Sequence, residues 1–334
     1  MTPAASPRHR LEYLGLTAGC RLIASLPFGM LRHIAALLGA CVWAVDSRGR
    51  KISLANLEAA FGDSLSSARR HSIGRAAYQS FARTMLELAW APNLNRKTVS
   101  RLVDFEGIDL SPCNLDRGRS VIYATMHYSN FEWVGLSGSY GIHPMPLIAQ
   151  EFKNPLLGPV FDRLRGSTGH PIFPRERAML RMLKHLRSGG KFGFLVDLSL
   201  DPKLGSVVVE QFGGLRTSMT QMHAALALKT GAAIVPLECR PAPRGRYKMV
   251  YHKEIPVEHD ATPAEIVQRT WNVLEQIIRQ QPENWLWSYK HWRFLPPSGE
   301  TARYPFYANR AKRFDALIRR EPGASAGLLA KGSG

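Results

Sequence analysis

The chain has 334 residues, of which 45% are hydrophobic, so it can form one large α/β domain with a substantial core or two small domains. Its 44 Lys and Arg residues against 26 Asp and Glu residues give a net charge of +18. This charge favours polyanionic partners: nucleic acid, an anionic membrane surface or an acidic carrier protein. The four cysteines are scattered without a CxxC pair, which argues against a disulfide framework and a zinc site and fits reduced thiols in the cytosol.

The first 50 residues combine apolar and basic character. The longest uncharged run, residues 33–45, is shorter than the ~20 apolar residues that span a bilayer, and no clear cleavage site marks a signal peptide. Apolar residues nevertheless recur at helical spacing in one stripe of Phe28, Leu31, Ile34, Leu38, Val42 and Val45. We expect a basic helical hairpin that lies on or dips into a membrane, the alternative being buried helices of a soluble core.

The remainder of the chain changes from helical to mixed character. Residues 51–90 are predicted to be helical, with a core-facing stripe of Tyr78, Phe81, Met85 and Leu88. From residue 121, apolar runs alternate with helical patterns, which predicts a mostly parallel sheet covered on both faces. The predicted strands span 121–125, 145–149, 192–196 and 232–238, with an edge strand within 246–257. Helices are predicted at 177–190 and 263–281, and the tail after Arg319 is expected to be frayed.

His127 follows the predicted strand 121–125 and Glu132 lies five positions further on, in "ATMHYSNFEWVGL" (124–136). In a parallel α/β sheet, ligands gather at the carboxyl ends of strands, so His127 is a candidate functional residue. Ser129-x-x-Glu132 also matches a capping box, in which the Ser129 hydroxyl accepts the Glu132 amide and the glutamate reaches back to the Ser129 amide. The capping role alone is therefore a complete explanation of Glu132.

The capping role and a catalytic role are compatible, because a carboxylate has two oxygens. If one oxygen of Glu132 accepts the Ser129 amide, the other can accept Nδ1–H of His127 and leave Nε2 as a general base. No strand–nucleophile–helix elbow is predicted, which argues against a serine hydrolase. The remaining chemistry is a base that deprotonates an acceptor hydroxyl for attack on an activated acyl group. The alternative is a histidine with a structural role only.

Four further blocks accompany His127-x-x-x-x-Glu132 in order along the chain. They are "NPLLGPVFDRLRGSTG" (154–169), "LRSGGKFGFLVDLSLDP" (186–202), "VVVEQFGGLRTSMTQMHAALALKTGAAIVP" (207–236) and "QPENWLWSYKHWRF" (281–294). The first motif resembles the HxxxxD/E motif of glycerolipid-type acyltransferases. Together the blocks resemble the late acyltransferases of lipid A biosynthesis and their mycobacterial relatives that acylate phosphatidylinositol mannosides. The resemblance covers roughly residues 30–295, and five blocks in order are more specific than HxxxxE alone.

The resemblance implies a role for each candidate residue. His127 becomes the general base and Glu132 its orienting partner. Arg163 and Arg165 fall in the family's Arg block, where a guanidinium can bind the thioester oxyanion or a substrate phosphate; otherwise they are solvated helix-face charges. Asp197 matches a family acidic position and is grouped with these substrate-binding or oxyanion-binding residues. It could face the histidine as a second acid, or it could be a turn residue. The chemistry requires neither a metal nor a cofactor. Tryptophans of the last block are expected in the core or at a membrane interface, namely Trp285, Trp287 and Trp292.

The resemblance also implies an organisation and a function. Residues 51–300 form a single glycerolipid-acyltransferase-like α/β domain, residues 1–50 carry the membrane-associating helices, and residues 301–334 form a C-terminal helix and tail. The implied activity is that of an O-acyltransferase on the cytoplasmic face of the inner membrane. It moves a fatty acyl group from an acyl-acyl-carrier-protein or acyl-CoA thioester to a hydroxyl of a lipid A precursor.

Other acceptors and other classes of protein stay open. The acceptor can instead be a phosphatidylinositol mannoside, an aminolipid or a lysophospholipid. The charge of +18 suits an anionic membrane surface and an acidic carrier protein equally. A non-catalytic lipid-binding protein on the same fold is an alternative of another class. A nucleic-acid binder is suggested by charge alone and lacks a recognisable binding motif.

Overall fold

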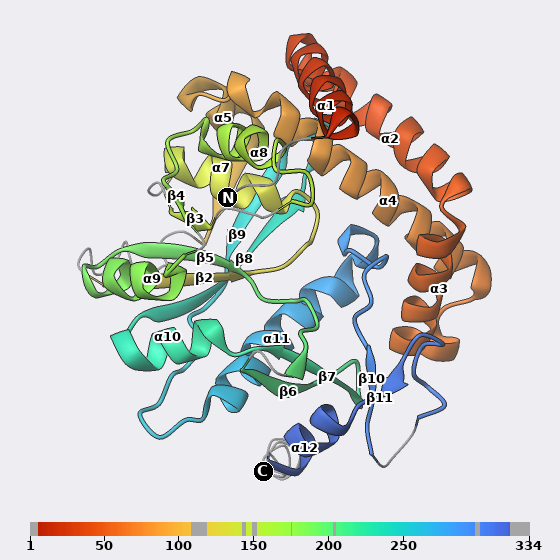
Figure 1. Ribbon diagram of the computed structural model, residues 1–334, viewed down its shortest axis with the longest axis vertical. Coiled ribbons are helices and arrows are strands. Elements are labelled where there is room, and N and C mark those ends of the chain that lie inside the picture. Colours follow the sequence, from red (N-terminus) through yellow and green to blue (C-terminus); the bar gives the residue numbers. More distant parts are fainter. Residues whose placement is uncertain are drawn as a thin grey trace.

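The computed structural model describes residues 6–107, 119–141, 145–148, 152–174, 176–202, 205–297 and 301–320. At its centre is a five-stranded sheet in the order β1-β9-β8-β2-β5, with helices on both sides and the N-terminal helices along one flank (Figure 1). The predicted α/β class with a mostly parallel central sheet is confirmed.

The central sheet is formed by β1 (Val103–Glu106), β2 (Val121–Thr125), β5 (Lys191–Leu195), β8 (Ala233–Pro241) and β9 (Tyr247–Tyr251). β2 pairs in parallel with β5 and β8, and β1 pairs in parallel with β9, whereas β8 and β9 are antiparallel. All of β2 is buried. Ile122 and Ala124 belong to one core cluster and Val121 and Tyr123 to another, because alternate side chains of a strand point to opposite faces.

The predicted strands at 121–125, 192–196 and 232–238 are confirmed, with ends shifted by a few residues. Of 145–149, only β3 (Leu147–Ile148) is a strand, paired with β4 (Ile172–Phe173); residue 149 lies outside the described residues. The prediction that 246–257 forms an edge strand is wrong, because β1 pairs with the outer side of β9. The apolar pattern also does not predict the antiparallel hairpin of β6 (Ser206–Gln211) and β7 (Leu215–Thr220) or the short pair β10 (Phe294–Leu295) and β11 (Asn309–Arg310).

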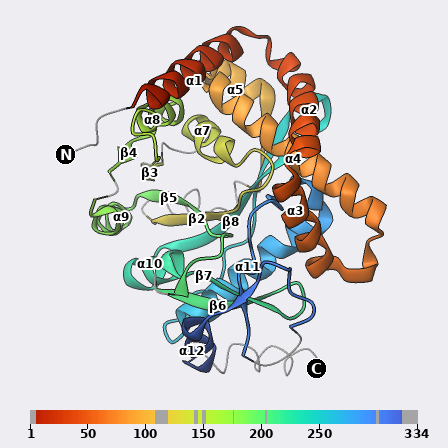
Figure 2. The same ribbon diagram turned by 45° about the vertical axis from the view of Figure 1, so that its right-hand side comes forward.

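Helices cover the sheet from both sides. They include α5 (Arg96–Leu102), α7 (Phe131–Gly141), α8 (Gly158–Gly166), α9 (Ala178–Arg187), α10 (Met222–Thr230), α11 (Pro263–Gln280) and α12 (Lys312–Arg320). α7 and α8 lie on one side of the sheet and α10 and α11 on the other (Figures 1 and 2). The predicted helices at 177–190 and 263–281 are confirmed as α9 and α11. The part of the tail from residue 321 onward lies outside the described residues.

The N-terminal helices are α1 (Pro7–Ser25), α2 (Phe28–Val45), α3 (Ser47–Phe61) and α4 (Ser67–Trp90). α2 approaches α4 so closely that a Cβ at Gly39 would lie 2.4 Å from the Cα of Gln79. The buried face of α2 consists of Leu31, Ala35, Gly39 and Trp43. The predicted stripe is divided between two environments, because its Leu31 is buried whereas its Leu38, Val42 and Val45 are exposed. α2 has the length and composition of a membrane span, with a mean hydropathy of 1.6 and 22% of its residues buried.

The tryptophans of the 281–294 block lie in the protein core. Trp285, Trp287 and Trp292 are at most 1% exposed and surround Phe212, with ring centroids 5.8–6.1 Å from that ring. Of the two places predicted for them, the core is the one observed. This packing joins the segment after α11 to the hairpin of β6 and β7.

Candidate active site

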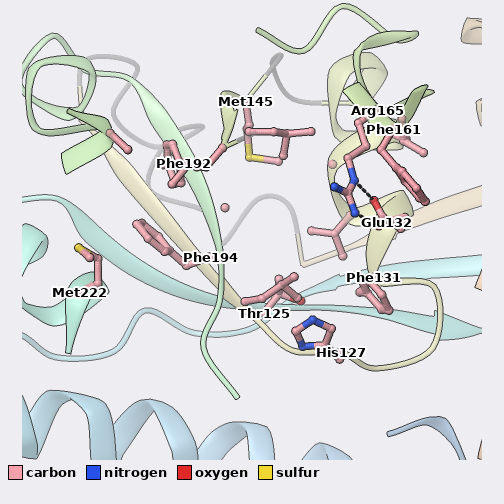
Figure 3. A pocket seen from close by; sticks show the side chains of 18 of the residues that line it. Thr125, His127, Phe131, Glu132, Met145, Phe161, Arg165, Phe192, Phe194 and Met222 are labelled. Atoms are coloured by element: carbon pink, nitrogen blue, oxygen red, sulfur yellow. Dashed lines mark hydrogen bonds and ion pairs between the residues drawn. The ribbon is translucent and has the colours of Figure 1, made fainter. Parts of the chain in front are cut away.

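An apolar cavity of about 1030 Å³ lies beside the carboxyl ends of β2 and β5. Its walls include Met145, Phe161, Phe192 and Phe194 (Figure 3), with additional apolar residues from α4 and α9. Phe81 and Met85 of α4 line this cavity as well, and Phe81 is 40% exposed. This part of the α4 stripe therefore faces the cavity and not the core, contrary to the prediction. The volume and lining suit a ligand with a long hydrocarbon part.

His127 and Asp197 meet at the edge of the sheet next to this cavity. Each lies two residues beyond the end of its strand, and the last residues of the two strands, Thr125 and Leu195, are register partners. Nδ1 of His127 is 2.9 Å from Oδ1 of Asp197, and the His127 backbone amide donates to Oδ2 at 3.0 Å. With Nδ1 engaged, Nε2 is the ring nitrogen that His127 presents to the cavity it lines (Figure 3).

The Asp197 carboxylate is fully enclosed and has a third donor. Nε1 of Trp285 donates to Oδ2 at 2.9 Å, and the carboxylate has no exposed surface. Burial alone would raise the pKa of Asp197, but the facing histidine and these hydrogen bonds outweigh it and hold the pKa below its ordinary value. Burial alone would lower the pKa of His127, because the charged form is the protonated one, yet the Asp197 carboxylate outweighs this effect and raises the pKa of His127 above 6.5. This arrangement orients and strengthens a base.

The hydrogen bond between His127 and Glu132 that the sequence predicts is not formed. Asp197, which we expected to face the histidine, occupies that position. Glu132 instead accepts two hydrogen bonds from Arg165, from Nε at 3.0 Å and from Nη2 at 2.6 Å (Figure 3). The two side chains are only 8% and 19% exposed, so this bidentate pair ties α7 to α8 at the cavity wall.

The predicted capping box is also wrong. Ser129 adopts a left-handed backbone conformation with φ of 48°, and its amide donates to the Asn284 carbonyl at 2.7 Å. The residue that caps α7 is Asn130, whose side-chain oxygen accepts the Trp133 amide at 3.3 Å. The helix starts one position later than the capping box requires, so Glu132 is the second residue of α7 instead of the third, and its carboxylate binds Arg165 instead of the Ser129 amide.

Buried side chains of α4 hold the turn that follows His127. Oγ1 of Thr84 donates to the Ser129 carbonyl at 2.7 Å, and Nδ2 of Asn130 donates to the Glu87 carboxylate at 2.6 Å. Glu87 is 1% exposed, and burial raises the pKa of its carboxyl even though Arg83 donates to it at 2.6 Å. The left-handed conformation is therefore fixed by contacts with an element far away in the sequence.

The segment 282–292 supports the site from the opposite side. The Leu286 amide donates to the His127 carbonyl at 3.1 Å, and the Trp285 ring that holds Asp197 stacks on His291 with centroids 3.9 Å apart. Burial lowers the pKa of His291 to about 4, so this histidine is neutral beside the dyad. The sequence predicts Trp285 only as a core or interface residue; its indole donor has no local signal that could reveal this partner.

The other candidate residues have different positions. Arg163, predicted with Arg165 to bind an oxyanion or phosphate, is exposed on α8 and does not line the cavity. Arg165 does line it. The carboxylate of Asp197, which the resemblance also groups with the substrate-binding residues, is enclosed and contacts His127 and Trp285. Within the described ranges, no group of three or more His, Cys, Asp or Glu residues is arranged to hold a metal ion.

Comparison with known proteins places this geometry in context. The family model for bacterial lipid A biosynthesis acyltransferases matches residues 3–294. A phosphatidylinositol mannoside acyltransferase of Mycolicibacterium smegmatis is 28% identical over 233 residues, which is 68% of this chain and 74% of that protein. A lipid A biosynthesis acyltransferase of Haemophilus influenzae is 21% identical over 280 residues, 83% of this chain and 86% of that protein. A phosphatidylinositol mannoside acyltransferase of Mycobacterium tuberculosis is 26% identical over 223 residues, 65% and 69% of the two chains.

Proposed function

The chain belongs to the bacterial lipid A biosynthesis acyltransferase family and is an acyltransferase acting on lipid substrates, and from this premise we propose that it is an O-acyltransferase with His127 as general base. The donor is an acyl-acyl-carrier-protein or acyl-CoA thioester, and the acceptor is a hydroxyl of a membrane glycolipid or lysolipid. The observation that supports this most directly is the 2.9 Å contact between Nδ1 of His127 and Asp197 at the wall of an apolar cavity.

The proposed reaction transfers one proton and one acyl group. The fatty chain of the donor occupies the apolar cavity of about 1030 Å³ and brings its thioester carbonyl to His127. Nε2 of His127 accepts the proton of the acceptor hydroxyl as its oxygen attacks the carbonyl carbon. The Asp197 carboxylate stabilises the imidazolium. When the tetrahedral intermediate collapses, the C–S bond breaks and His127 returns the proton to the departing thiolate.

The oxyanion of the tetrahedral intermediate requires hydrogen-bond donors. We assign this role to the backbone amides of Phe131 and Glu132, because first-turn amides of a helix have no intrahelical acceptor and the N-terminus favours negative charge. Both residues line the cavity, and the Phe131 ring lies 4.9 Å from the His127 ring between centroids. Glu132 has a second role in this proposal: its carboxylate holds the Arg165 guanidinium at the cavity wall.

The proposed acceptor is a lipid A precursor, as the matching family suggests. A phosphatidylinositol mannoside is a second candidate, because a relative named for that substrate has the higher identity, 28% against 21%. Both are anionic glycolipids, for which a chain of charge +18 is suited. A comparison of the lipids of a deletion strain with those of its parent should show one lipid class that lacks one acyl chain, and that class identifies the acceptor.

We further propose that the enzyme acts at the cytoplasmic face of the inner membrane. Large apolar side chains stand exposed at the cavity wall, with Phe81, Met179 and Leu195 each 40–42% exposed. Others lie on α1 and α2, including Leu14, Leu37 and Val45, which are 61–80% exposed. Such surfaces bind to the boundary between headgroups and acyl chains.

The substitution His127→Ala tests the catalytic proposal. Because His127 supplies the base, we expect acyl transfer from a purified acyl-carrier-protein donor to fall by at least ~10²-fold, while unfolding and vesicle binding resemble wild type. If the variant retains substantial turnover, His127 is not the base. If the wild type transfers no acyl group to any lipid acceptor, the alternative of a lipid-binding protein on this fold is favoured instead.

A further inference from the structure

A second, smaller cavity lies apart from the larger one and shares no lining residue with it. It has a volume of about 400 Å³ and is lined by Ser47, Arg48, Lys51, Ile52, Lys290 and Phe306. We call it the basic cavity. The first four residues belong to the start of α3, immediately after the exposed end of α2, and the other two come from the C-terminal part of the chain. We propose that the basic cavity binds the phosphate of an anionic lipid headgroup.

The charges in the basic cavity favour an anion. Arg48, Lys51 and Lys290 line it, and in the part of the chain that the structure describes none of them forms an ion pair with a carboxylate. The adjoining acid, Asp46, already accepts the Gly49 amide and the Tyr78 hydroxyl, each at 2.8 Å. Three cations around one concave site repel each other unless an anion joins them, and a phosphate offers several acceptor oxygens at once.

The apolar rim of the basic cavity favours a lipid over a free phosphate ion. The Phe306 ring is 59% exposed, with the Lys51 ammonium 4.5 Å from its centroid, and the side chain of Ile52 lies against the cavity. Val45, the last residue of α2, is 80% exposed. A free phosphate ion has no apolar group to place against these side chains, whereas a phospholipid has a glycerol and the first methylenes of its chains.

The position of the basic cavity relates it to the reaction. Lys290 belongs to the segment 282–292, which also supplies the Trp285 indole to Asp197. Asn56 of α3 fixes this segment, since its Nδ2 donates to the carbonyls of Trp287 and Tyr289 at 2.7 Å each. A headgroup in the basic cavity therefore fastens to the bilayer the same segment that supports the catalytic dyad. This inference rests on the membrane association proposed above.

The test compares the vesicle binding of two triple variants. One carries Arg48→Ala, Lys51→Ala and Lys290→Ala. The control removes the same charge from α12, which lies away from α2 and α3 (Figure 1), through Lys312→Ala, Arg313→Ala and Arg320→Ala. Binding of the full chain is measured by co-sedimentation with phosphatidylcholine vesicles, with and without phosphatidylglycerol, and circular dichroism checks that both variants are folded.

Each basic side chain near an anionic surface contributes roughly a factor of five to affinity, so the first variant should lose about a hundredfold on anionic vesicles. The α12 control should lose less than about fivefold. Equal losses in the two variants, or full binding by the first, would overturn the headgroup site. Submillimolar binding of inorganic phosphate combined with equal vesicle binding of the two variants would assign the basic cavity to a soluble phosphate and overturn its lipid assignment.

The test is independent of acyl transfer. His127→Ala should bind vesicles as the wild type does, so an error in the catalytic proposal leaves the result unchanged. If the wild type binds neither type of vesicle, the membrane association itself is wrong and the headgroup site falls with it. If the wild type binds and only the comparison of the two variants fails, the headgroup site alone is overturned.

Discussion

Replacing Asp197 with asparagine tests whether a carboxylate sets the proton positions of His127. Two donors, the His127 amide and Nε1 of Trp285, converge on Oδ2 at 3.0 and 2.9 Å, whereas Nδ1 of His127 faces Oδ1. Asparagine has one accepting oxygen, which satisfies both donors if it takes the Oδ2 position. The amide nitrogen then faces Nδ1 and donates to it. The ring proton moves to Nε2, and the lone pair that should accept the hydroxyl proton is lost.

The expected magnitude follows from this change of tautomer. Loss of the correct tautomer in a histidine–carboxylate pair lowers kcat by about 10⁴, equivalent to ~5.5 kcal/mol of barrier. The residual activity should also respond differently to pH. Nε2 must be unprotonated to act as a base, so the wild-type rate falls as the pH drops through the raised pKa of His127. Without the Asp197 charge, burial of the ring prevails and lowers this pKa, so the fall occurs at a lower pH.

The assay is the steady-state transfer of a labelled acyl chain from an acyl-carrier-protein thioester to a glycolipid in micelles, over a series of pH values. Asp63→Asn is the matched control, because it neutralises an exposed carboxyl in the short helix Gly62–Ser64 outside the cavity. Thermal unfolding of both variants separates lost catalysis from lost folding. The reasoning is refuted if Asp197→Asn keeps kcat within about tenfold of wild type. It is also refuted if the rate of this variant falls at the same acidic pH as the wild-type rate.

Three further predictions concern the surroundings of the dyad. Glu132→Gln removes the negative charge that pairs with Arg165 and should lower the unfolding free energy, measured in urea, by about 2–3 kcal/mol. If this variant shifts the pH at which the rate falls as far as Asp197→Asn does, Asp197 is not the residue that sets the pKa of His127. Gly193 lines the cavity, and a Cβ added there meets no atom within 4 Å. Gly193→Leu should therefore fill part of the cavity and shift the preference among acyl donors toward shorter chains. An unchanged preference would argue that the cavity does not hold the acyl chain. Thr84→Val removes the buried donor to the Ser129 carbonyl. It should lower the unfolding free energy by about 1–3 kcal/mol and also lower kcat. Wild-type values of both quantities would show that this contact does not hold the turn.

The sequence predicts those elements whose burial is encoded locally. β2 and β8 lie inside the sheet and are buried along most of their length, so they read as continuous apolar runs. The edge strand β5 is predicted from its own short apolar run, residues 192–196. β1 has the sequence VDFE, with only Val103 fully buried, and its strand character comes from pairing with β9, which no local pattern reveals. Alternating apolar and polar residues in 246–257 suggest an edge strand. This pattern indicates which face of the strand is buried, but it does not indicate which strands pair with it.

The same limit applies to the candidate site. His127 is predictable because it follows a buried strand, and the family resemblance places Asp197 near it. The wrong partner, Glu132, was suggested by a spacing that assumes an ordinary turn, whereas the positive φ of Ser129 depends on Thr84 and on the Asn284 carbonyl. Contacts between distant segments select this conformation, and a single sequence carries no trace of them.

The position of α4 has a consequence for how a substrate hydroxyl is chosen. One face of this helix packs on α2 so tightly that added atoms at Gly39 or Gly74 would collide with its partner. Other side chains of the same helix, Thr84 and Glu87, hold the turn after His127. With the membrane association proposed above, α4 therefore sets the distance between the membrane-facing helix α2 and Nε2 of His127. We therefore expect that, among chemically similar hydroxyls, the enzyme acylates the one that lies at the corresponding depth in the headgroup layer.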